Sequence, residues 1–600
     1  MARLHARGVA DFTVRQNVQL HWVSIESLPE VLDTLWRAGL TTQGSCGDDT
    51  RNITGCPLAG LDSDEWCDAS PLVRQATKLL VGNPEFYNFP RKFKICVTGC
   101  RVWCSYPEIN DVGLTVVSRT LDGRPEIGFA LHVGGGLSSE PYFAQRLGAV
   151  VRWNQVLPVI QGVVEIFRDA DCLRENRERA RLKYLFMRHG WTAQTFQEEL
   201  ERRIGFRLDP ETEVIPPADA YRDHVGIHRQ KAEGTSYVGA AVLRGRISAE
   251  QPQAAAELAD GFANGELRIT NMQNLLVVNV PNDRAEPLAA ELEAVGLRPA
   301  GSPFWRGAIT CTGTEFCRLA ITETKSFTRW LVEELEDRLP DFDQQLKLHV
   351  TGCPNSCGQH WIADIGIEGK KMKVDGKMVD AYYFFVGGGV GKHQTMARAA
   401  GFRCPANEVP DAIARLLRAY QSGRWGAETL RQFFARHSEG ATRNWLAGEE
   451  LAEVDFEIVP GVTSALSAAA AVRVGLTERT VASSVIFMTG HCCAEQFSGS
   501  RLSVTGAALR PTVVVYMPTD YSAVTTQLRA AGWENDTPCL IVSNAATARE
   551  ARFLTTRADL PQAPQLPSPK LLIVGNVVRS ASVRESHGNA TTSILSSLAR

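Results

Sequence analysis

The sequence predicts an α+β fold in which one unit occurs twice, followed by a smaller α/β region. Three observations support this fold class: a repeated strand–helix pattern, a repeated loop–strand–glycine pattern, and a change in composition near residue 455. The chain has 600 residues, of which 44% are hydrophobic and 22% are charged. This composition is typical of globular domains, and the length allows several of them.

The strand–helix pattern occurs at residues 12–40 and again at residues 267–297. The two segments read FTVRQNVQLHWVSIESLPEVLDTLWRAGL and LRITNMQNLLVVNVPNDRAEPLAAELEAVGL. In each, alternating apolar residues predict a strand, and the amphipathic stretch after it predicts a helix that ends near a glycine. We therefore expect two half-domains of one kind, over residues 1–60 and 220–303.

The loop–strand pattern also occurs twice. KFKICVTGCRVWCSYPEINDVGL starts at Lys92, and QLKLHVTGCPNSCGQHWIADIGI starts at Gln345. Each is followed by a strand that ends in three glycines, LHVGGGLSS in the first copy and FFVGGGVGK in the second. Because the order of elements is the same, we expect a pseudo-twofold pair of larger domains, over residues 61–210 and 304–440.

The last part of the chain has a different character. Residues 421–450 lack the strand pattern and are expected to be helical. After residue 455, the short apolar segments VIFMTG, TVVVYM, CLIVSN and LLIVGNVV alternate with helix-like stretches. This alternation predicts a separate α/β domain over residues 441–600.

Charge and cysteine content narrow the class of protein. The net charge of −3 gives no reason to expect nucleic acid or an anionic membrane as a partner. No apolar run reaches the roughly 18–20 residues of a membrane span. The first residues, MARLHARGVADFTVRQ, lack the apolar core of a secretory signal, and the fifteen cysteines are an odd number. We therefore expect a cytoplasmic protein whose cysteines are thiols or metal ligands.

Four cysteines in the second half lie in two glycine-containing loops: Cys311 and Cys317 in CTGTEFC, then Cys353 and Cys357 in TGCPNSCG. Four thiolates from two tight loops can surround a 4Fe–4S cluster. A structural zinc ion is the alternative, although zinc sites more often use pairs of cysteines two residues apart. The spacing alone leaves both possibilities open.

The longer segments around these cysteines resemble a known family. CTGTEFCRLAITETK and TGCPNSCGQHWIADIG closely resemble the sirohaem-binding signature of assimilatory nitrite and sulfite reductases. FTVRQNVQLHW, CGDDTRNITGCPLAG, PRKFKICVTGC, PEINDVGL and VGGGLS resemble the same family, so the resemblance covers about residues 10–440. It implies ferredoxin-like half-domains with sirohaem and Fe–S domains, a 4Fe–4S cluster on the four cysteines, and sirohaem whose iron is bridged by Cys357.

The resemblance also implies an anion pocket and contacts to sirohaem. Arg51, Lys92 and Lys94 resemble the substrate-binding arginine and lysines of the family, and side chains two apart in a strand point to the same side. Four polar residues are implied as partners of the sirohaem carboxylates: Arg15, Gln16, Gln273 and Asn274. Polar residues on exposed strands remain the alternative interpretation of these four.

The expected reaction is a six-electron reduction of nitrite to ammonia, with sulfite reduction to sulfide as the alternative. The lysine at position 94 resembles the residue found in sulfite reductases. The sequences of the motifs CTGTEFC and CPNSCGQ instead resemble those of the branch with ferredoxin-dependent nitrite reductases. No flavin or NAD motif is present, so an external one-electron donor such as ferredoxin is implied. Arg318, Lys325 and Arg329 are candidates for the surface that receives it.

The first half shows a partial copy of the cysteine pattern. Three of its cysteines are interpreted as mirrors of Cys317, Cys353 and Cys357: Cys56, Cys100 and Cys104. In that interpretation Thr50 stands in place of Cys311. Either Cys46 substitutes and a second cluster forms, or the repeat is degenerate.

The resemblance starts late, because the family usually has roughly sixty further residues in front, including an arginine of the anion pocket. A catalytically impaired sirohaem-binding or maturation scaffold is therefore the alternative function.

Segments of the last domain resemble the second half of uroporphyrinogen-III C-methyltransferase, over about residues 455–580. They read FEIVPGVTSALSAAAAVRVGLTERTVASSVIFMTGH, TVVVYMP and DTPCLIVSNAATAREARF. Thr463, Ser464 and Met517 match residues that line the S-adenosylmethionine site of that family. Because the family's first half is absent here, we expect neither S-adenosylmethionine binding nor independent methyltransferase activity.

Overall fold

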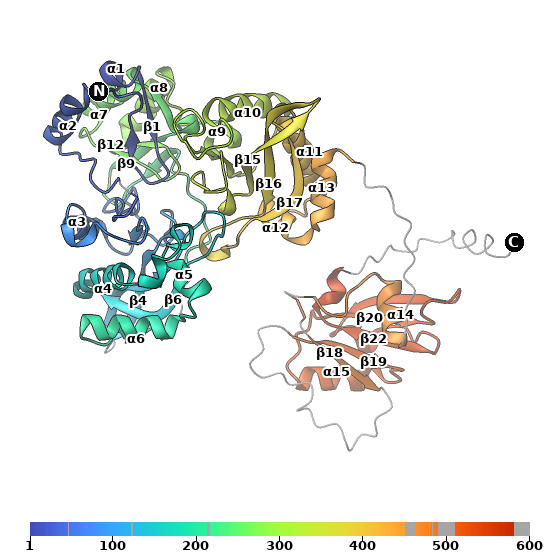
Figure 1. The fold of residues 1–600 in the computed structure, drawn as a ribbon. Coiled ribbons are helices and arrows are strands. Elements are labelled where there is room, and N and C mark those ends of the chain that lie inside the picture. The colour runs from blue at the N-terminus through green and yellow to red at the C-terminus, as the bar shows by residue number, and fades with distance from the viewer. Residues whose placement is uncertain are drawn as a thin grey trace. The chain divides into compact units, whose positions relative to one another are not determined.

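The computed structural model describes residues 1–45, 47–121, 124–212, 216–449, 463–478, 481–482, 484–489 and 510–580. Two compact units divide the chain, Met1–Ala452 and Glu453–Arg600. Figure 1 shows both units as ribbons. None of the helices in the described residues is long and apolar enough to cross a membrane.

The beginning and the middle of the chain combine into one body of the first unit (Figure 1). Its sheets have the orders β10-β1-β2 and β11-β12-β9-β8. The strands are β1 (Val9–Phe12), β2 (Val18–Gln19), β8 (Gly226–Arg229), β9 (Thr235–Ala240), β10 (Arg246–Ser248), β11 (Leu267–Ile269) and β12 (Leu275–Pro281), with helices α1 (Ala2–His5), α2 (Leu28–Arg37), α7 (Glu250–Phe262) and α8 (Ala285–Ala294). Val9 pairs with Ser248, so the two predicted half-domains meet through an antiparallel strand pair.

Each of the two larger repeats contains a five-stranded sheet. The first has the order β3-β4-β5-β6-β7 and the second has the order β13-β14-β15-β16-β17. The first contains β3 (Ile95–Thr98), β4 (Val112–Leu121), β5 (Arg124–Val133), β6 (Gln145–Arg152), β7 (Asp209–Pro210), α3 (Ser70–Leu80), α4 (Val156–Arg168), α5 (Lys183–Arg188) and α6 (Ala193–Ile204). The second contains β13 (Ala308–Thr310), β14 (Leu348–Thr351), β15 (Ile365–Val374), β16 (Lys377–Val386), β17 (Arg398–Pro405), α9 (Pro303–Gly307), α10 (Lys325–Arg338), α11 (Val409–Gly423), α12 (Leu430–Arg436) and α13 (Glu439–Ala447).

The registers of these sheets show that the two repeats have one architecture. β3 pairs in parallel with β4, and β14 pairs in parallel with β15, starting at equivalent residues. The next two strand pairs are antiparallel in both sheets. An irregularity interrupts the last of these pairs between Ala130 and His132, and again between Tyr383 and Phe385. The predicted duplication is therefore confirmed, and β3 of the first repeat corresponds to β14 of the second.

Lys92 and Lys94 do not lie inside a strand as expected, because β3 begins at Ile95. Phe93 between them forms an isolated parallel bridge with Thr50. The segment nevertheless leads directly into a fully buried strand.

The second unit contains one sheet with the strand order β18-β19-β22-β20-β21. Its strands are β18 (Val485–Thr489), β19 (Thr512–Tyr516), β20 (Pro538–Ser543), β21 (Ala551–Thr556) and β22 (Lys570–Val574), and its helices are α14 (Ser464–Ala471) and α15 (Tyr521–Ala530). Apolar clusters lie on both faces of this sheet, because alternate residues of its central strands belong to different clusters. The expected separate α/β region is confirmed.

Candidate active site

The four cysteines of the second repeat converge from two loops. Cys311 follows β13 directly, and Cys353 and Cys357 follow β14. Burial raises the pKa of Cys353, and the charges of Cys311 and Cys317 raise it further. Burial also raises the pKa of Cys357, which Lys92 lowers and Cys311 raises. Each of the four sulfurs thus interacts electrostatically with at least one other of the set.

The surroundings of these sulfurs suit a cluster that carries negative charge. The Gly352 N–H lies 3.2 Å from Cys311 Sγ, and the Asn355 side-chain amide lies 3.6 Å from Cys353 Sγ. Donors of this kind stabilise the reduced cluster and raise its potential. Among the described residues, no three of these four cysteines have sulfurs that all lie within 4.8 Å of one another. A single zinc ion with bonds of about 2.3 Å would hold its sulfurs about 3.8 Å apart, so the spacing fits a cluster better.

Lys92 and Lys94 of the first repeat face Cys357 of the second. Burial lowers the pKa of each lysine, and the Cys357 thiolate raises it. The pKa of Lys94 is held well below its ordinary value because burial is reinforced by Arg15, Arg181 and Lys92. The charges of both lysines and of the Cys357 sulfur thus act on one another across the two repeats, and the place where they meet is called the cation recess.

Arg51 belongs to the same recess. Its backbone N–H donates to the Phe93 carbonyl at 2.8 Å, which joins its loop to the lysine segment. Its guanidinium donates to the Ser45 carbonyl at 2.5 Å and to the Gly44 carbonyl at 3.3 Å. Its charge contributes to the lowered pKa of Lys92. The structure therefore brings together the three cations predicted for the anion pocket.

Arg15 is held at the border of this recess. Its guanidinium donates to Asn110 Oδ1 and to the Asn52 carbonyl, both at 2.7 Å, and the Asn52 amide donates back to the Arg15 carbonyl at 2.6 Å. Burial lowers the pKa of Arg15 to about 10. Its Nε is buried without a hydrogen-bond partner.

The recess carries more positive than negative charge. Arg181 pairs with Asp111 at 2.8 Å, which leaves the charges of Lys92, Lys94 and Arg15 without a comparable carboxylate partner in the contacts described. Grouped buried cations are unfavourable unless anions join them. An acidic macrocycle together with a small oxyanion would supply those anions, so the residues present fit sirohaem and its substrate.

The other three predicted sirohaem contacts are already engaged with the protein backbone. Gln273 donates to the Phe12 carbonyl at 2.7 Å and accepts from the Thr310 N–H at 3.0 Å. Asn274 accepts from the Val242 N–H at 3.1 Å. Gln16 donates to the Gly55 carbonyl at 2.9 Å. Gln16 and Gln273 thereby join the half-domain body to the two larger repeats, whereas Asn274 bonds within that body.

The sequence did not single out Arg181, although its ion pair is 10% and 0% exposed at the arginine and at Asp111. The Lys94 N–H also donates to Asp111, at 2.7 Å, so the carboxylate holds the lysine segment and the arginine together. Asp111 lies within the PEINDVGL motif, which was a signal for this position. Arg181 lies in a charged helical stretch about 70 residues further along the chain. That stretch contains no motif that marks Arg181 as a site residue.

Lys325 is not a surface residue, and its proposed role in receiving a donor protein is wrong. Its side chain is 2% exposed, and Nζ lies 3.8 Å from Asp11 Oδ1. Arg318 is exposed, and Arg329 is 61% exposed where it pairs with Glu333 at 2.9 Å. Lys325 therefore joins α10 to β1 instead of binding a partner.

The sheet registers correct the predicted matching of the cysteines. Thr54 bridges Cys96 of β3, whereas Ile309 pairs with His349 of β14, so Cys56 takes the place of Cys311. The loops agree: the Asp62 N–H donates to the Leu58 carbonyl as the Cys317 N–H donates to the Gly313 carbonyl, both at 3.0 Å. Asp62, not Thr50, stands where the first repeat lacks a cysteine. Cys46 lies outside the described residues.

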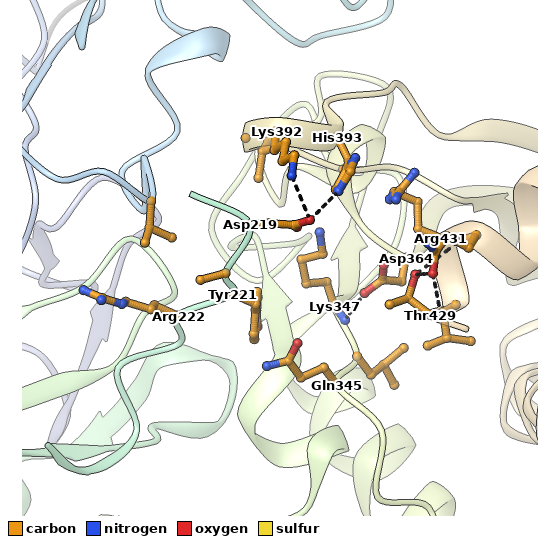
Figure 2. Close-up of a pocket in the computed structure, with 18 of the residues that line it drawn as sticks. Asp219, Tyr221, Arg222, Gln345, Lys347, Asp364, Lys392, His393, Thr429 and Arg431 are labelled. Carbon is orange, nitrogen blue, oxygen red and sulfur yellow. Dashed lines mark hydrogen bonds and ion pairs between the residues drawn. The ribbon is translucent and has the colours of Figure 1, made fainter. Parts of the chain in front are cut away.

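A second recess lies on the other side of this pseudo-twofold arrangement, and Figure 2 shows it in close-up. The cavity has a volume of about 580 Å³ and is lined by residues of both repeats and of the segment between them, including Cys104, Arg222, Gln345 and Lys347. By the same register, Lys347 is the counterpart of Lys94, Gln345 of Lys92 and Cys104 of Cys357. The Lys347 N–H donates to Asp364 at 2.8 Å, as Lys94 does to Asp111. The cavity is thus the counterpart of the cation recess.

In the second unit, the side chain of Thr463 caps α14 by accepting from the Ala465 N–H at 3.1 Å. The Tyr516 hydroxyl lies 3.1 Å from the same Thr463 oxygen. Ser464 is the first residue of the helix, and Met517 after β19 is 45% exposed with a positive φ of 47°. The three residues predicted to match a cofactor site thus lie at the ends of α14 and β19.

Family models match nearly all of the first unit. The nitrite and sulphite reductase 4Fe–4S domain matches residues 46–208 and 302–451. The nitrite/sulfite reductase ferredoxin-like half domain matches residues 1–37 and 228–295. The tetrapyrrole (corrin/porphyrin) methylase model matches residues 440–561.

Individual relatives agree with these models. An assimilatory ferredoxin-dependent nitrite reductase of Haloferax mediterranei is 38% identical over 75% of this chain and 78% of its own length. The chloroplastic ferredoxin–nitrite reductase of Zea mays is 39% identical over 69% and 73%. Sulfite reductase [ferredoxin] 1 of Mycolicibacterium paratuberculosis is 37% identical over 73% and 78%. The solved structure of the Mycobacterium tuberculosis NirA protein superposes with a TM-score of 0.69 at 34% identity, over 74% of this chain and 80% of that one.

Proposed function

This chain belongs to the nitrite and sulfite reductase family, and we propose that its first unit reduces nitrite to ammonia by six electrons. The observation that carries the proposal is the position of Cys357. Its sulfur belongs to the cysteine set of the second repeat, yet its charge raises the pKa of Lys92 and Lys94 of the first. Electrons and a bound anion can therefore meet at one place.

The cysteines Cys311, Cys317, Cys353 and Cys357 would hold the 4Fe–4S cluster, and Cys357 together with the cations would hold sirohaem. When bound, sirohaem would supply the iron at which the anion is reduced. Arg15, with a buried guanidinium and an unpartnered Nε, binds one of its carboxylates. Gln16, Gln273 and Asn274 position the strands around it through their backbone hydrogen bonds.

The cations bind the anion and handle protons. Arg51 and Lys92 orient the oxyanion and offset its charge. Lys94 has a pKa well below the ordinary lysine value, so its ammonium gives up a proton more readily than an exposed lysine does. Reduction of nitrite to ammonia consumes protons as well as electrons, and this lysine is positioned to deliver them.

Sulfite is the second candidate substrate, and Lys94 is the observation that favours it. A second ammonium beside Lys92 suits an oxyanion of higher charge. Nitrite is preferred here because relatives named as nitrite reductases reach 38% and 39% identity. Lys94→Asn removes the second charge and is expected to raise the ratio of nitrite to sulfite turnover; an unchanged ratio would remove Lys94 from the choice of substrate.

We propose ferredoxin as the electron donor, since the relatives of both kinds are named for it. The exposed Arg318 lies next to Cys317, and Arg329 lies on α10, so an acidic donor would meet positive charge near the cluster. We also propose a cytoplasmic location, because reduced thiols are the state that a cluster requires.

The deciding experiment is anaerobic purification, visible spectra and turnover of nitrite and sulfite with reduced ferredoxin or a reduced dye. Sirohaem bands, about four further irons per chain and turnover of nitrite support the proposal. Sirohaem bands without turnover would show the scaffold function, and a colourless zinc protein would contradict both. Incubation of the same protein with uroporphyrinogen III and S-adenosylmethionine is expected to give no methylated product.

A further inference from the structure

The three cysteines of the first repeat form a compact buried set. Cys56, Cys100 and Cys104 are 7%, 1% and 5% exposed. Their sulfurs all lie within 4.8 Å of one another, and those of Cys104 and Cys56 are 3.5 Å apart. Three buried thiols gathered at this spacing need either protons shared among them or a cation.

We propose that Cys56, Cys100 and Cys104 bind one thiophilic divalent cation of the zinc type, distinct from the 4Fe–4S cluster. Zinc–sulfur bonds of about 2.3 Å in a tetrahedron place the sulfurs about 3.8 Å apart, close to the observed spacing. The equivalent cysteines of the second repeat are set wider, although the backbone frame is the same. In the first repeat, the distances between the three sulfurs therefore suit a single metal ion and not a cluster.

The loop around Cys100 surrounds its sulfur with hydrogen-bond donors. The thiols of Cys104 and Cys56 and the backbone N–H groups of Val102 and Cys104 all donate to it. Arg222 lies close enough for the Cys100 charge to raise its own pKa. Backbone donors of this kind commonly stabilise thiolates bound to a metal.

The fourth ligand position is not taken by a protein side chain in this arrangement. Asp62 stands where the second repeat has Cys317, but Arg222 holds its carboxylate at 2.5 Å. His224 is 2% exposed and neither ring nitrogen has a hydrogen-bond partner, yet it does not join the group of ligand atoms that lie within 4.8 Å of one another. The three thiolates therefore carry the site, and a water molecule would complete the tetrahedron.

The position of the site explains what the cation would do. Tyr237, Leu276 and Val278 of the half-domain body pack against the three cysteines. The site therefore joins that body to the loops before and after β3, including Gly55, which Gln16 holds from the other side. Cys104 and Arg222 also line the cavity of Figure 2, which provides a route for the ion. The cation stabilises the half of the molecule that supplies the substrate-binding cations.

Metal analysis of the purified full chain, expressed with zinc in the medium, tests the proposal. We expect about one zinc per chain in addition to the iron of the cluster and sirohaem, and zinc X-ray absorption dominated by sulfur at about 2.3 Å. Cys56→Ser and Cys104→Ser should lose the zinc, whereas Cys67→Ser, at a neighbouring cysteine outside the set, should retain it. His224→Ala and Asp62→Asn, which leave the three thiolates in place, should also retain the zinc.

Wild-type protein without zinc, with its three thiols free or two of them in a disulfide, would overturn the proposal. About four extra irons per chain with no zinc would overturn it in favour of a second cluster. If the serine variants do not fold, the wild-type zinc content and absorption spectrum still decide. Because these measurements need no turnover, their failure is separate from failure of the proposed reductase activity.

Discussion

The two cysteine sets share one backbone frame but differ in spacing and in what they face. In the second repeat, four sulfurs are set apart and one of them, Cys357, acts electrostatically on Lys92 and Lys94. In the first repeat, three sulfurs are drawn together, and Asp62 stands at the fourth place. The duplicated backbone fixes the positions of the loops. A few side chains then determine whether a loop serves electron transfer or only stabilises the fold.

The recess around Lys94 and its counterpart, the cavity around Lys347, also share a backbone arrangement but differ in their side chains. Lys94 and Lys347 both donate a backbone N–H to an aspartate, at 2.7 and 2.8 Å. However, Lys92 has Gln345 as its counterpart, so the second recess lacks an ammonium at this position. Arg51 and Arg15 add to the positive charge around the lysines of the first recess. The equivalent cavity also has cations, among them Lys347 and Lys392, but carboxylates such as Asp219 and Asp364 line it as well, so its positive charge is offset.

Replacing equivalent cysteines gives the largest expected contrast. Cys353→Ser removes a cluster ligand, so iron content and nitrite turnover should both fall to background, because a 4Fe–4S cluster requires its thiolates. Cys100→Ser, the counterpart in the first repeat, should keep the cluster iron and lose zinc instead. Iron analysis and visible spectra of the two variants measure this. Loss of cluster iron from folded Cys100→Ser would show that the two sets do not have separate roles.

Replacing equivalent lysines tests the charge difference. Lys94→Ala should lower kcat/KM for the anion by about 100-fold, the usual size of effect for one preorganised donor at a site of developing charge. Lys347→Ala should leave kcat/KM within about twofold, since that lysine lies in the cavity of Figure 2. Steady-state kinetics on both variants, with sirohaem content as the reference, gives the comparison. Equal losses in the two would assign substrate binding to both recesses.

Much of this arrangement could be predicted from the sequence. The repeated segments and glycine triplets predicted the duplication because they preserve the order of the elements. The cysteine loops and the segment with Lys92 and Lys94 were recognised because their motifs are short and continuous. The fold class and the cluster domain are confirmed, whereas the roles of the individual site residues remain proposals.

What the sequence could not predict depends on pairing between distant segments. Spacing alone matched Cys56 with Cys317, and only the bridge between Thr54 and Cys96 shows that it takes the place of Cys311. The local sequence around Lys325 suggests an exposed side chain, but the structure shows it buried near Asp11. Arg181 enters the recess through an ion pair with a residue 70 positions away. Such contacts leave no local pattern.

The smallest expected effect concerns a reciprocal contact between the repeats. Glu108 accepts from the Gly391 N–H at 2.5 Å, and its counterpart Trp361 donates to the Ser138 carbonyl at 2.8 Å. Burial raises the pKa of Glu108 to about 7 despite the hydrogen bond from Gly391. Its folded pKa thus lies above the unfolded value of about 4.3, so the folded state binds more protons between these two values.

Stability from Glu108 is therefore present at low pH and is lost as pH rises through about 7. Glu108→Gln mimics the protonated acid. In the wild type, the free energy of unfolding should fall by up to about 1.4 kcal/mol per pH unit between pH 4.5 and 7 because of Glu108, and the variant should lack this slope. The variant should therefore be more stable than the wild type at pH 8. Urea unfolding of the first unit across this range measures the slope. Trp361→Phe should instead destabilise by about 1 kcal/mol at every pH, because it removes a neutral hydrogen bond. Parallel pH curves for wild type and Glu108→Gln would show that the carboxyl is ionised in the folded protein.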